Sequence, residues 1–266
     1  MLPVFVIAIM IWLTTLWGGL GDQSRQLANN YDLRQKERDI IEVAEAMELY
    51  FQEFKQLPAD LNTLATTPGY EYVASSLNNW QDYSRSSNLT DGTWTFQRAA
   101  AYTFDRSRGD TTTSYLASNA CGTNSFSTEQ GSWCGAQNSR WHVLDTREKI
   151  PVLITAQRLR MGFLSQKFAD YFNANGNYPN SDSSNVPFAA SSIASLASLV
   201  GYAGSASNCT GNYQYKGIPL DCGDLFDLWG GAVGYQFENN GHVIFVSEPP
   251  IRDGSGNKLV IAVDRA

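Results

Sequence analysis

Four cysteines are the residues whose spacing points most directly to a chemistry, and that chemistry is disulfide formation. Cys121 precedes Cys134 by thirteen residues, and Cys209 precedes Cys222 by the same interval. An even cysteine count, with no C-x-x-C pair and only two histidines, favours disulfides over a zinc site. Of the three possible connectivities, Cys121–Cys134 with Cys209–Cys222 is the simplest, because each bond closes a short local loop. Disulfides persist in oxidising compartments, so the pattern predicts an exported protein.

The sequence Cys-Gly-x5-Trp occurs twice, as CGAQNSRW over residues 134–141 and as CGDLFDLW over residues 222–229. Each copy places a tryptophan, Trp141 or Trp229, seven residues after a cysteine. An exposed tryptophan could stack on a sugar ring in an adhesin, whereas a buried one would fill the space over its own disulfide. We prefer the second interpretation and predict that both tryptophans are core residues.

Candidate catalytic residues are few. His142 and His242 are the two histidines that could act as a base near neutral pH, and His142 lies close to Asp145 in the sequence. The chain has no G-x-S-x-G or H-E-x-x-H motif and no glycine-rich phosphate loop opening a helix. We therefore expect no enzymatic activity, and a periplasmic enzyme is the alternative that we favour least.

A calcium loop is a candidate metal site near the C-terminus. Asp253, Ser255 and Asn257 place oxygen atoms at alternate positions, as calcium loops do. No distal bidentate carboxylate follows them, and a hairpin turn uses the same residue types without an ion. We prefer the turn, so we expect no cofactor and keep calcium as the alternative.

Composition excludes several classes of partner. The 266 residues include 19 Lys+Arg and 26 Asp+Glu, which gives a net charge of −7, and the basic residues are not clustered. Nucleic acids and anionic membrane surfaces bind concentrated positive charge, so neither is expected as a partner. The length allows one large domain or two small ones.

The first residues form an apolar segment. MLPVFVIAIMIWLTTLWGGLG carries no charge before Asp22, and its apolar stretch is close to the length that spans a bilayer. It has no basic n-region and no A-x-A-like cleavage site, so a retained anchor is preferred to a cleaved signal. We expect a transmembrane or filament-core helix over residues 1–21, loosened at Gly18–Gly21.

Two amphipathic helices are predicted downstream of this segment. In the first, six residues separate Tyr50-Phe51 from Pro58, which would end the helix at Leu57. In the second, six residues separate Tyr171-Phe172 from Pro179. The apolar residues that recur at helical steps are Ile40, Val43, Ala44, Met47, Tyr50, Phe51 and Phe54 in the first helix, and Met161, Leu164, Phe168, Tyr171 and Phe172 in the second.

Four landmarks occur in the same order in both halves of the chain. They are D-x-R-[QE]-K from Asp32 and from Asp145, Tyr-Phe before a proline, L-x-x-L followed by Gly-Tyr, and C-x12-C-G-x5-W. Ordered self-similarity of this kind indicates a tandem duplication. We therefore predict a first unit over residues 22–144 and a second unit over residues 145–266.

Each unit is predicted to end in antiparallel strands. Asn240-Gly241 lies between the β-like runs 232–237 and 242–246, which is a strong hairpin signal, and a third run covers residues 259–263. In the first unit, residues 92–96 and 101–104 are expected to pair in the same way. A helix followed by a small sheet, with one local disulfide in each unit, gives an α+β fold.

Two stretches of the second unit resemble a known family. YFNANGNYP, residues 171–179, is similar to the Y-x-x-x-x-G-x-Y-P that ends the helix of major pseudopilins, and DLWGGAVGY, residues 227–235, is similar to their D-P-W-G-x-x-Y-x-Y entry to the sheet. With the apolar N-terminal helix, the chain resembles type IV pilins and type II secretion pseudopilins over roughly its whole length, as one anchor and two head units. It departs from the family at Leu228, where the family has proline, and at Phe5, where the family has glutamate.

The resemblance implies a function by association. It implies a structural subunit, such as a minor pilin of a type IVb or conjugative pilus, whose N-terminal helix binds other pilin subunits and rests in the bacterial inner membrane before assembly. The head would face the periplasm, or the exterior in a filament. A pilus-tip adhesin or ligand-binding module is the alternative.

Overall fold

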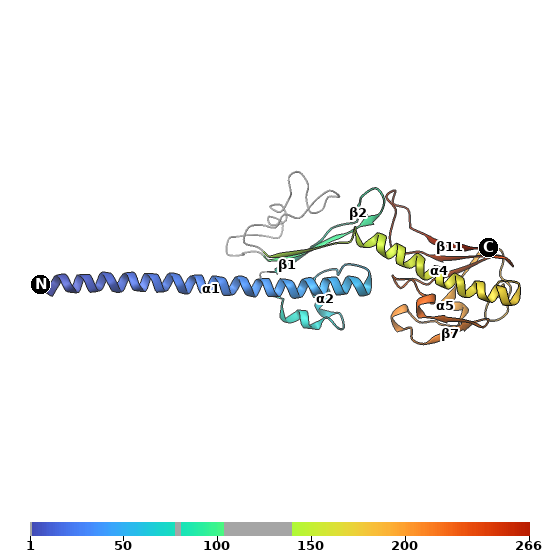
Figure 1. The fold of residues 1–266 in the computed structure, drawn as a ribbon, viewed down its shortest axis with the longest axis horizontal. Coiled ribbons are helices and arrows are strands. Elements are labelled where there is room, and N and C mark those ends of the chain that lie inside the picture. Colours follow the sequence, from blue (N-terminus) through green and yellow to red (C-terminus); the bar gives the residue numbers. More distant parts are fainter. Residues whose placement is uncertain (1, 78–80, 104–139) are drawn as a thin grey trace.

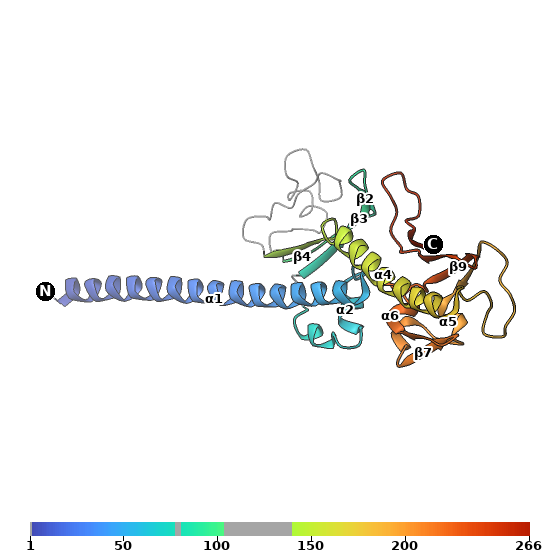
Figure 2. The ribbon, with the colours of Figure 1, turned by 45° about the vertical axis from the view of Figure 1, so that its right-hand side comes forward.

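The computed structural model describes residues 2–77, 81–103 and 140–266, and of residues 2–22 it describes the backbone alone. A long N-terminal helix projects from a head in which helices pack beside small antiparallel sheets (Figures 1 and 2). The helices are α1 (Leu2–Phe54), α2 (Leu61–Thr66), η1 (Glu71–Ser75), α4 (Lys149–Asn175), α5 (Leu196–Leu199), η3 (Ala206–Asn208) and α6 (Cys222–Leu225). The strands are β1 (Gln81–Arg85), β2 (Leu89–Thr90), β3 (Thr95–Phe96), β4 (Arg98–Thr103), β5 (Trp141–Asp145), β6 (Ser192–Ser195), β7 (Asn212–Tyr215), β8 (Ile218–Asp221), β9 (Gly234–Asn239), β10 (His242–Ser247) and β11 (Ile261–Arg265).

Helix α1 is a single 53-residue helix whose last third packs into the head. It ends where Lys55 takes the left-handed conformation, at φ 56°, and its N–H donates to the Phe51 carbonyl over 2.8 Å. Pro58 follows, so the predicted end of the helix near Leu57 is confirmed to within three residues. The predicted loosening at Gly18–Gly21 is wrong, because the backbone stays helical through these glycines.

The first hydrophobic core forms between α1, α2, η1 and the sheet β1-β4-β5. Strand β4 pairs antiparallel with both neighbours, with Ala101 opposite Tyr83 on one side and opposite His142 on the other. The buried residues of this core are Ile40, Val43, Ala46, Met47, Tyr50, Phe51, Leu57, Leu64, Tyr70, Val73, Ala99, Ala101 and Leu144. The predicted apolar stripe of the first helix is therefore the face that the head buries.

Helix α4 covers the second sheet, whose strand order is β11-β10-β9-β6 with antiparallel pairing throughout. Gly176 ends the helix in the left-handed conformation, at φ 74°, and its N–H donates to the Phe172 carbonyl over 2.7 Å. The β9–β10 hairpin turns at Asn240-Gly241, and β11 adds the third strand, so the meander predicted for residues 232–263 is confirmed.

An aromatic cluster forms the centre of the second core. The ring of Phe168 on α4 stacks on Tyr235 at 5.2 Å between centroids and meets Phe245 edge-on at 4.9 Å. The hydroxyl of Tyr235 donates to the Pro179 carbonyl over 2.7 Å, so burying the ring leaves no unpaired polar group. Aromatic pairs at these distances add to the free energy gained from burial alone.

The two cores are joined by the short hairpin β2–β3. Leu89 and Phe96 of this hairpin are buried in the second core, although they precede the predicted unit boundary at residues 144 and 145. Residues 92–96 do not pair with residues 101–103 as predicted, and residue 104 of the predicted run lies outside the described residues. Strand β3 pairs with β2, whereas β4 pairs with β1 and β5.

The structure confirms the coarse α+β prediction, with a long N-terminal helix and small antiparallel sheets. Within the residues whose side chains are described, no helix is both long and apolar enough to cross a membrane. The anchor predicted for residues 1–21 lies outside those residues.

Candidate functional site

A disulfide closes a loop between strands β6 and β9 of the second sheet. Cys209 and Cys222 are bonded, with their Cα atoms 5.8 Å apart, as predicted from their spacing. Cys222 opens the one-turn helix α6, where Asp221 and Asp224 form a capping box. The other predicted pair, Cys121 and Cys134, lies outside the described residues.

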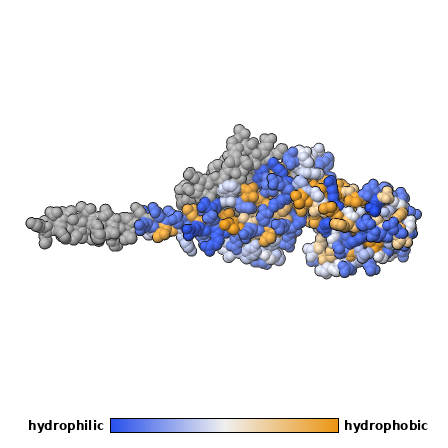
Figure 3. All heavy atoms as spheres, in the orientation of Figure 1, coloured by the Kyte–Doolittle hydropathy of each residue, from blue (hydrophilic) through white to orange (hydrophobic). Residues whose placement is uncertain are grey.

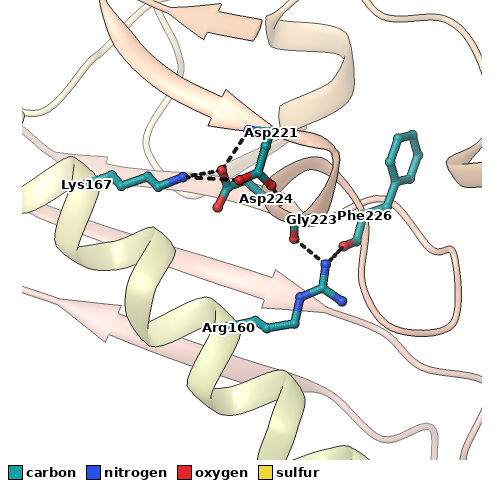
Figure 4. Close-up of polar contacts among 6 residues, drawn as sticks. All are labelled: Arg160, Lys167, Asp221, Gly223, Asp224 and Phe226. Atoms are coloured by element: carbon teal, nitrogen blue, oxygen red, sulfur yellow. Dashed lines mark hydrogen bonds and ion pairs between the residues drawn. The ribbon is translucent and has the colours of Figure 1, made fainter. Parts of the chain in front are cut away.

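Two cations of α4 hold α6 in place (Figure 4). Lys167 Nζ lies 2.5 Å from Asp224 Oδ2 and 3.7 Å from Asp221 Oδ2. Arg160 donates to the carbonyl oxygens of Gly223 and Phe226 over 2.7 and 3.3 Å. These donors satisfy carboxylates and carbonyls that α6 is too short to satisfy itself, so the cluster has a structural role.

Gly223 allows Arg160 to approach the backbone of α6 because it has no side chain. A Cβ at that position would lie 2.8 Å from the Arg160 guanidinium and 3.0 Å from Asp221 Oδ1. The glycine of the second Cys-Gly-x5-Trp copy therefore leaves room for the close approach of the arginine side chain to the backbone.

Asp227 organises the turn that leads into β9. Its Oδ1 accepts from the backbone N–H groups of Trp229 and Gly231 over 2.9 and 2.8 Å, and its Oδ2 accepts from the Ser247 hydroxyl over 2.8 Å. The side chain is buried, so these three donors replace the water that the carboxylate loses. Sequence analysis quoted this residue only as part of a motif and gave it no role.

Leu228 uses its backbone N–H to bind α4. That N–H donates to Gln157 Oε1 over 3.0 Å, and Gln157 is buried on the inner face of the helix. A proline at this position would have no N–H to donate, so the leucine is matched to the buried glutamine.

The two repeated tryptophans lie in different environments. Trp229 is partly buried and packs against the second core, as predicted for a core aromatic. Trp141 begins the edge strand β5 and is 41% exposed, so the prediction that it fills the core is wrong. Trp141 is the first residue of the edge strand β5, whereas Trp229 lies in the turn organised by Asp227 and packs against the second core.

His142 lies between charged residues of α1 and α4. Its Nε2 is 3.9 Å from Glu48 Oε1, and Lys149 Nζ lies 2.7 Å from the other oxygen of the same carboxylate. Burial lowers the pKa of His142 below its ordinary value, and Glu48 offsets this in part. The Glu48 carboxylate accepts from Lys149 rather than from the imidazole, and within the described residues His142 Nε2 is buried without a hydrogen-bond partner.

The other candidate catalytic and metal residues also have structural partners. His242 begins β10 and contacts the Asp264 carboxylate across the β10–β11 pair. Asp253 Oδ1 accepts from the backbone N–H groups of Ser255 and Asn257 over 2.9 and 2.8 Å, which is the geometry of a turn. The hydrogen bond from the Asn257 side-chain amide, followed by those from the backbone N–H groups, lowers the pKa of Asp253. In the part of the chain open to description, no group of three or more His, Cys, Asp or Glu could hold a metal ion.

A pocket of about 210 Å³ opens where the two cores meet. Phe51 and Leu57 line it from the first core, and Ile150, Trp229 and Ile251 line it from the second. Among the described residues that line it, Lys55 is the single charged one, so these residues form no set of groups for acid–base or nucleophilic chemistry.

An exposed face of α1 is the feature with the clearest capacity for association. Leu27, Tyr31, Ile41 and Leu49 are 70, 70, 51 and 49% exposed, and their spacing places them on the side of the helix opposite the buried stripe. Beyond the residues drawn in grey, the surface of the projecting helix alternates hydrophilic and hydrophobic residues (Figure 3). Sequence analysis missed this second, outward stripe because the inward one is stronger.

No family model, curated protein or solved structure matches this chain.

Proposed function

We propose that the protein is a structural subunit of a type IV pilus or of a related secretion or conjugation filament. The observation that carries the proposal is the single helix α1, which runs from the apolar segment of the sequence into the first core without a break. A rigid helix of this length transmits the position of the apolar segment directly to the head. Subunits could then associate through their helices while the heads remain outside.

The exposed stripe of α1 supports this function. Isolated large apolar side chains are common on protein surfaces, but four on one face of α1, two on its projecting part and two beside the head, form a surface suited to a neighbouring helix. The proposal places residues 1–21 in the inner membrane before assembly and in the filament interior afterwards, with the head in the periplasm or outside the cell.

We further propose that the two cores derive from one duplicated unit. Both helices carry a Tyr-Phe pair in the last turns, and the phenylalanine carbonyl accepts from a left-handed residue four positions on, Lys55 or Gly176. In both parts an L-x-x-L turn follows, capped by Asp60 or by Ser195 through the backbone N–H at the third position. These local structures are what a duplication would preserve.

Two features separate the halves, and the proposal must accommodate them. The D-x-R-x-K motif from Asp32 lies inside α1, whereas the one from Asp145 spans the end of β5 and the start of α4. The first cysteine pair falls between β4 and β5 in the sequence, whereas Cys209 and Cys222 precede the β9–β11 meander. A duplication followed by strand insertion would account for both differences.

Electron microscopy of surface filaments tests the function. Filaments sheared from cells that encode the protein would be labelled with gold-conjugated antibody against the head, beside cells expressing a chain without residues 2–21. We expect labelled filaments only with the full chain, because the head alone has no segment to bury. A full chain that folds but is never found on filaments would contradict the proposal.

The exposure of Trp141 favours a second candidate, a ligand-binding module on the same filament. An exposed tryptophan on an edge strand can stack on a sugar ring. Saturable glycan binding that is lost in Trp141→Ala and kept in Trp229→Phe would support it, and binding unchanged in Trp141→Ala would dismiss it.

A further inference from the structure

We propose that the outward face of α4 binds the projecting helix of a second copy of this chain. The inference rests on the filament function proposed above and identifies one of its contact surfaces. The two surfaces are the α4 stripe, formed by Leu159, Phe163, Gln166 and Asp170, and the stalk stripe on α1, formed by Leu27, Tyr31, Arg34 and Arg38.

The α4 stripe faces away from the core that α4 covers. Leu159 and Phe163 are 62 and 72% exposed, and Val152 continues the stripe at 66% exposure toward the start of the helix. The buried residues of α4, such as Met161 and Phe168, lie on the opposite side. Phe163, at 72% exposure, gains little from burial within this chain, and together with Leu159 and Val152 it forms an apolar patch.

The stalk stripe matches the α4 stripe in spacing and in residue type. Both run in steps of four, three and four residues, which keeps every member on one helix face. Aligned in parallel, Leu27 meets Leu159 and Tyr31 meets Phe163. Leu27 and Tyr31 are each 70% exposed, so all four apolar side chains are available for contact.

Charge is complementary in the same alignment. Arg34 falls opposite Gln166, and Arg38 falls opposite Asp170. Asp170 Oδ1 accepts from Gln166 over 2.9 Å, which holds the carboxylate on the stripe. Within the described residues neither arginine has an ion-pair partner, so a neighbouring carboxylate is their natural complement.

The direction of the helices fits a repeated assembly. Helices α1 and α4 run in the same general direction along the molecule (Figures 1 and 2). A second copy displaced along that direction would bring its stalk beside α4 in the parallel sense. A contact between two different surfaces of identical chains leaves one of each free, so it can repeat from chain to chain, and it builds an open filament when the rotation between neighbours does not close a ring.

The contact is too small to act alone. Twelve residues of paired helix extend only about 17 Å, which buries less area than a stable stand-alone interface. It therefore adds to the packing of the apolar segments and fixes the axial offset between neighbouring heads.

Photo-crosslinking of the full chain in the cells that encode it tests the inference. A benzoylphenylalanine in place of Tyr31 would be activated by light, and the product would be sized and mapped by mass spectrometry. We expect a product of two chains that joins position 31 to residues 159–166 of the other copy. Arg38→Glu and Asp170→Arg should each lower its yield by about fivefold, and the double variant should restore it. The control is Arg25→Glu, on the opposite side of the stalk, which should leave the yield unchanged.

Failure of this contact and failure of the filament function would give different results. Two-chain products that map only to another α1, or that ignore the charge variants, overturn this contact while leaving the filament function intact. A chain that yields no two-chain product and is absent from filaments overturns both.

Discussion

A single carboxylate, that of Asp227, determines the path of the chain into the second sheet. It accepts two backbone N–H groups from its own turn and one hydroxyl from Ser247 on β10, all in a buried place. Water cannot replace such a buried acceptor, so removing the carboxylate leaves three donors without a partner. The cost is the desolvation of those three donors, which is more than the loss of one average hydrogen bond.

Asp227→Ala should therefore lower the free energy of unfolding by about 2–4 kcal/mol. Ser247→Ala, which removes one donor and leaves the turn intact, should cost about 1 kcal/mol. Urea unfolding of the full chain measures both, and Asp170→Ala on the exposed face of α4 is the matched control. Equal effects of the Asp227 and Asp170 variants would contradict this role.

His142 should make stability depend on pH. Burial lowers its pKa in the folded chain, so the unfolded chain, with a pKa near 6.5, takes up its proton first as pH falls. The contribution of neutral His142 to the free energy of unfolding is fully present above about pH 6.5. It is lost as the pH falls from that value toward the lower pKa of the folded chain. The wild-type melting temperature should fall more between pH 7.5 and 5.5 than that of His142→Gln, whose side chain does not titrate. Parallel falls in the two proteins would refute the assignment.

At the scale of elements, the turn 252–257 joins the two cores by docking on the β2–β3 hairpin. The N–H of Gly254 donates to the Thr93 carbonyl over 2.9 Å, and Thr95 donates to the Arg252 carbonyl over 2.9 Å. A Cβ at Gly254 would lie 1.9 Å from the Gly92 carbonyl oxygen, so the backbones approach too closely for any side chain.

Gly254→Ala should displace this turn and destabilise the protein by about 1–3 kcal/mol. The Thr95 amide should exchange faster with deuterium, because its acceptor moves away. Ser255→Ala, on the exposed side of the same turn, is the control and should leave both quantities unchanged. Unaltered Thr95 exchange in Gly254→Ala would show that the docking does not join the cores.

The elements predicted correctly are those defined by local sequence. The helix ends near Phe54 and Asn175, the Asn240-Gly241 hairpin and the Cys209–Cys222 bond depend on neighbouring residues, so periodicity, turn chemistry and spacing identify them. The pairing of β3 and the exposure of Trp141 depend on residues far away in the sequence, which local patterns do not encode. The role of Asp227 was missed for the same reason, since one of its donors comes from another strand.

At the scale of the whole molecule, the duplication makes a prediction about the first half. If the halves share an ancestor, Cys121 should be bonded to Cys134 as Cys209 is to Cys222. Peptide mapping of the full chain without reduction identifies the pair. A free thiol at either position, or a bond of either residue to Cys209 or Cys222, would remove the main covalent parallel between the halves.

The projecting helix is the part of the molecule that assembly should change most. Residues 23–31 of α1 are exposed on all sides, and a helix with no tertiary contacts opens readily and exchanges its amide hydrogens fast. In a filament the same residues would be covered by neighbouring helices.

The most direct test of the proposed function is therefore hydrogen–deuterium exchange of residues 23–38, measured on the purified full chain and on filaments sheared from cells. The proposed function predicts that the chain is present in the filaments and that exchange over this segment is slowed there at least about tenfold, while exchange in the two cores stays the same. Absence from filaments, or equally fast exchange in both states, would contradict a subunit that assembles through its helix.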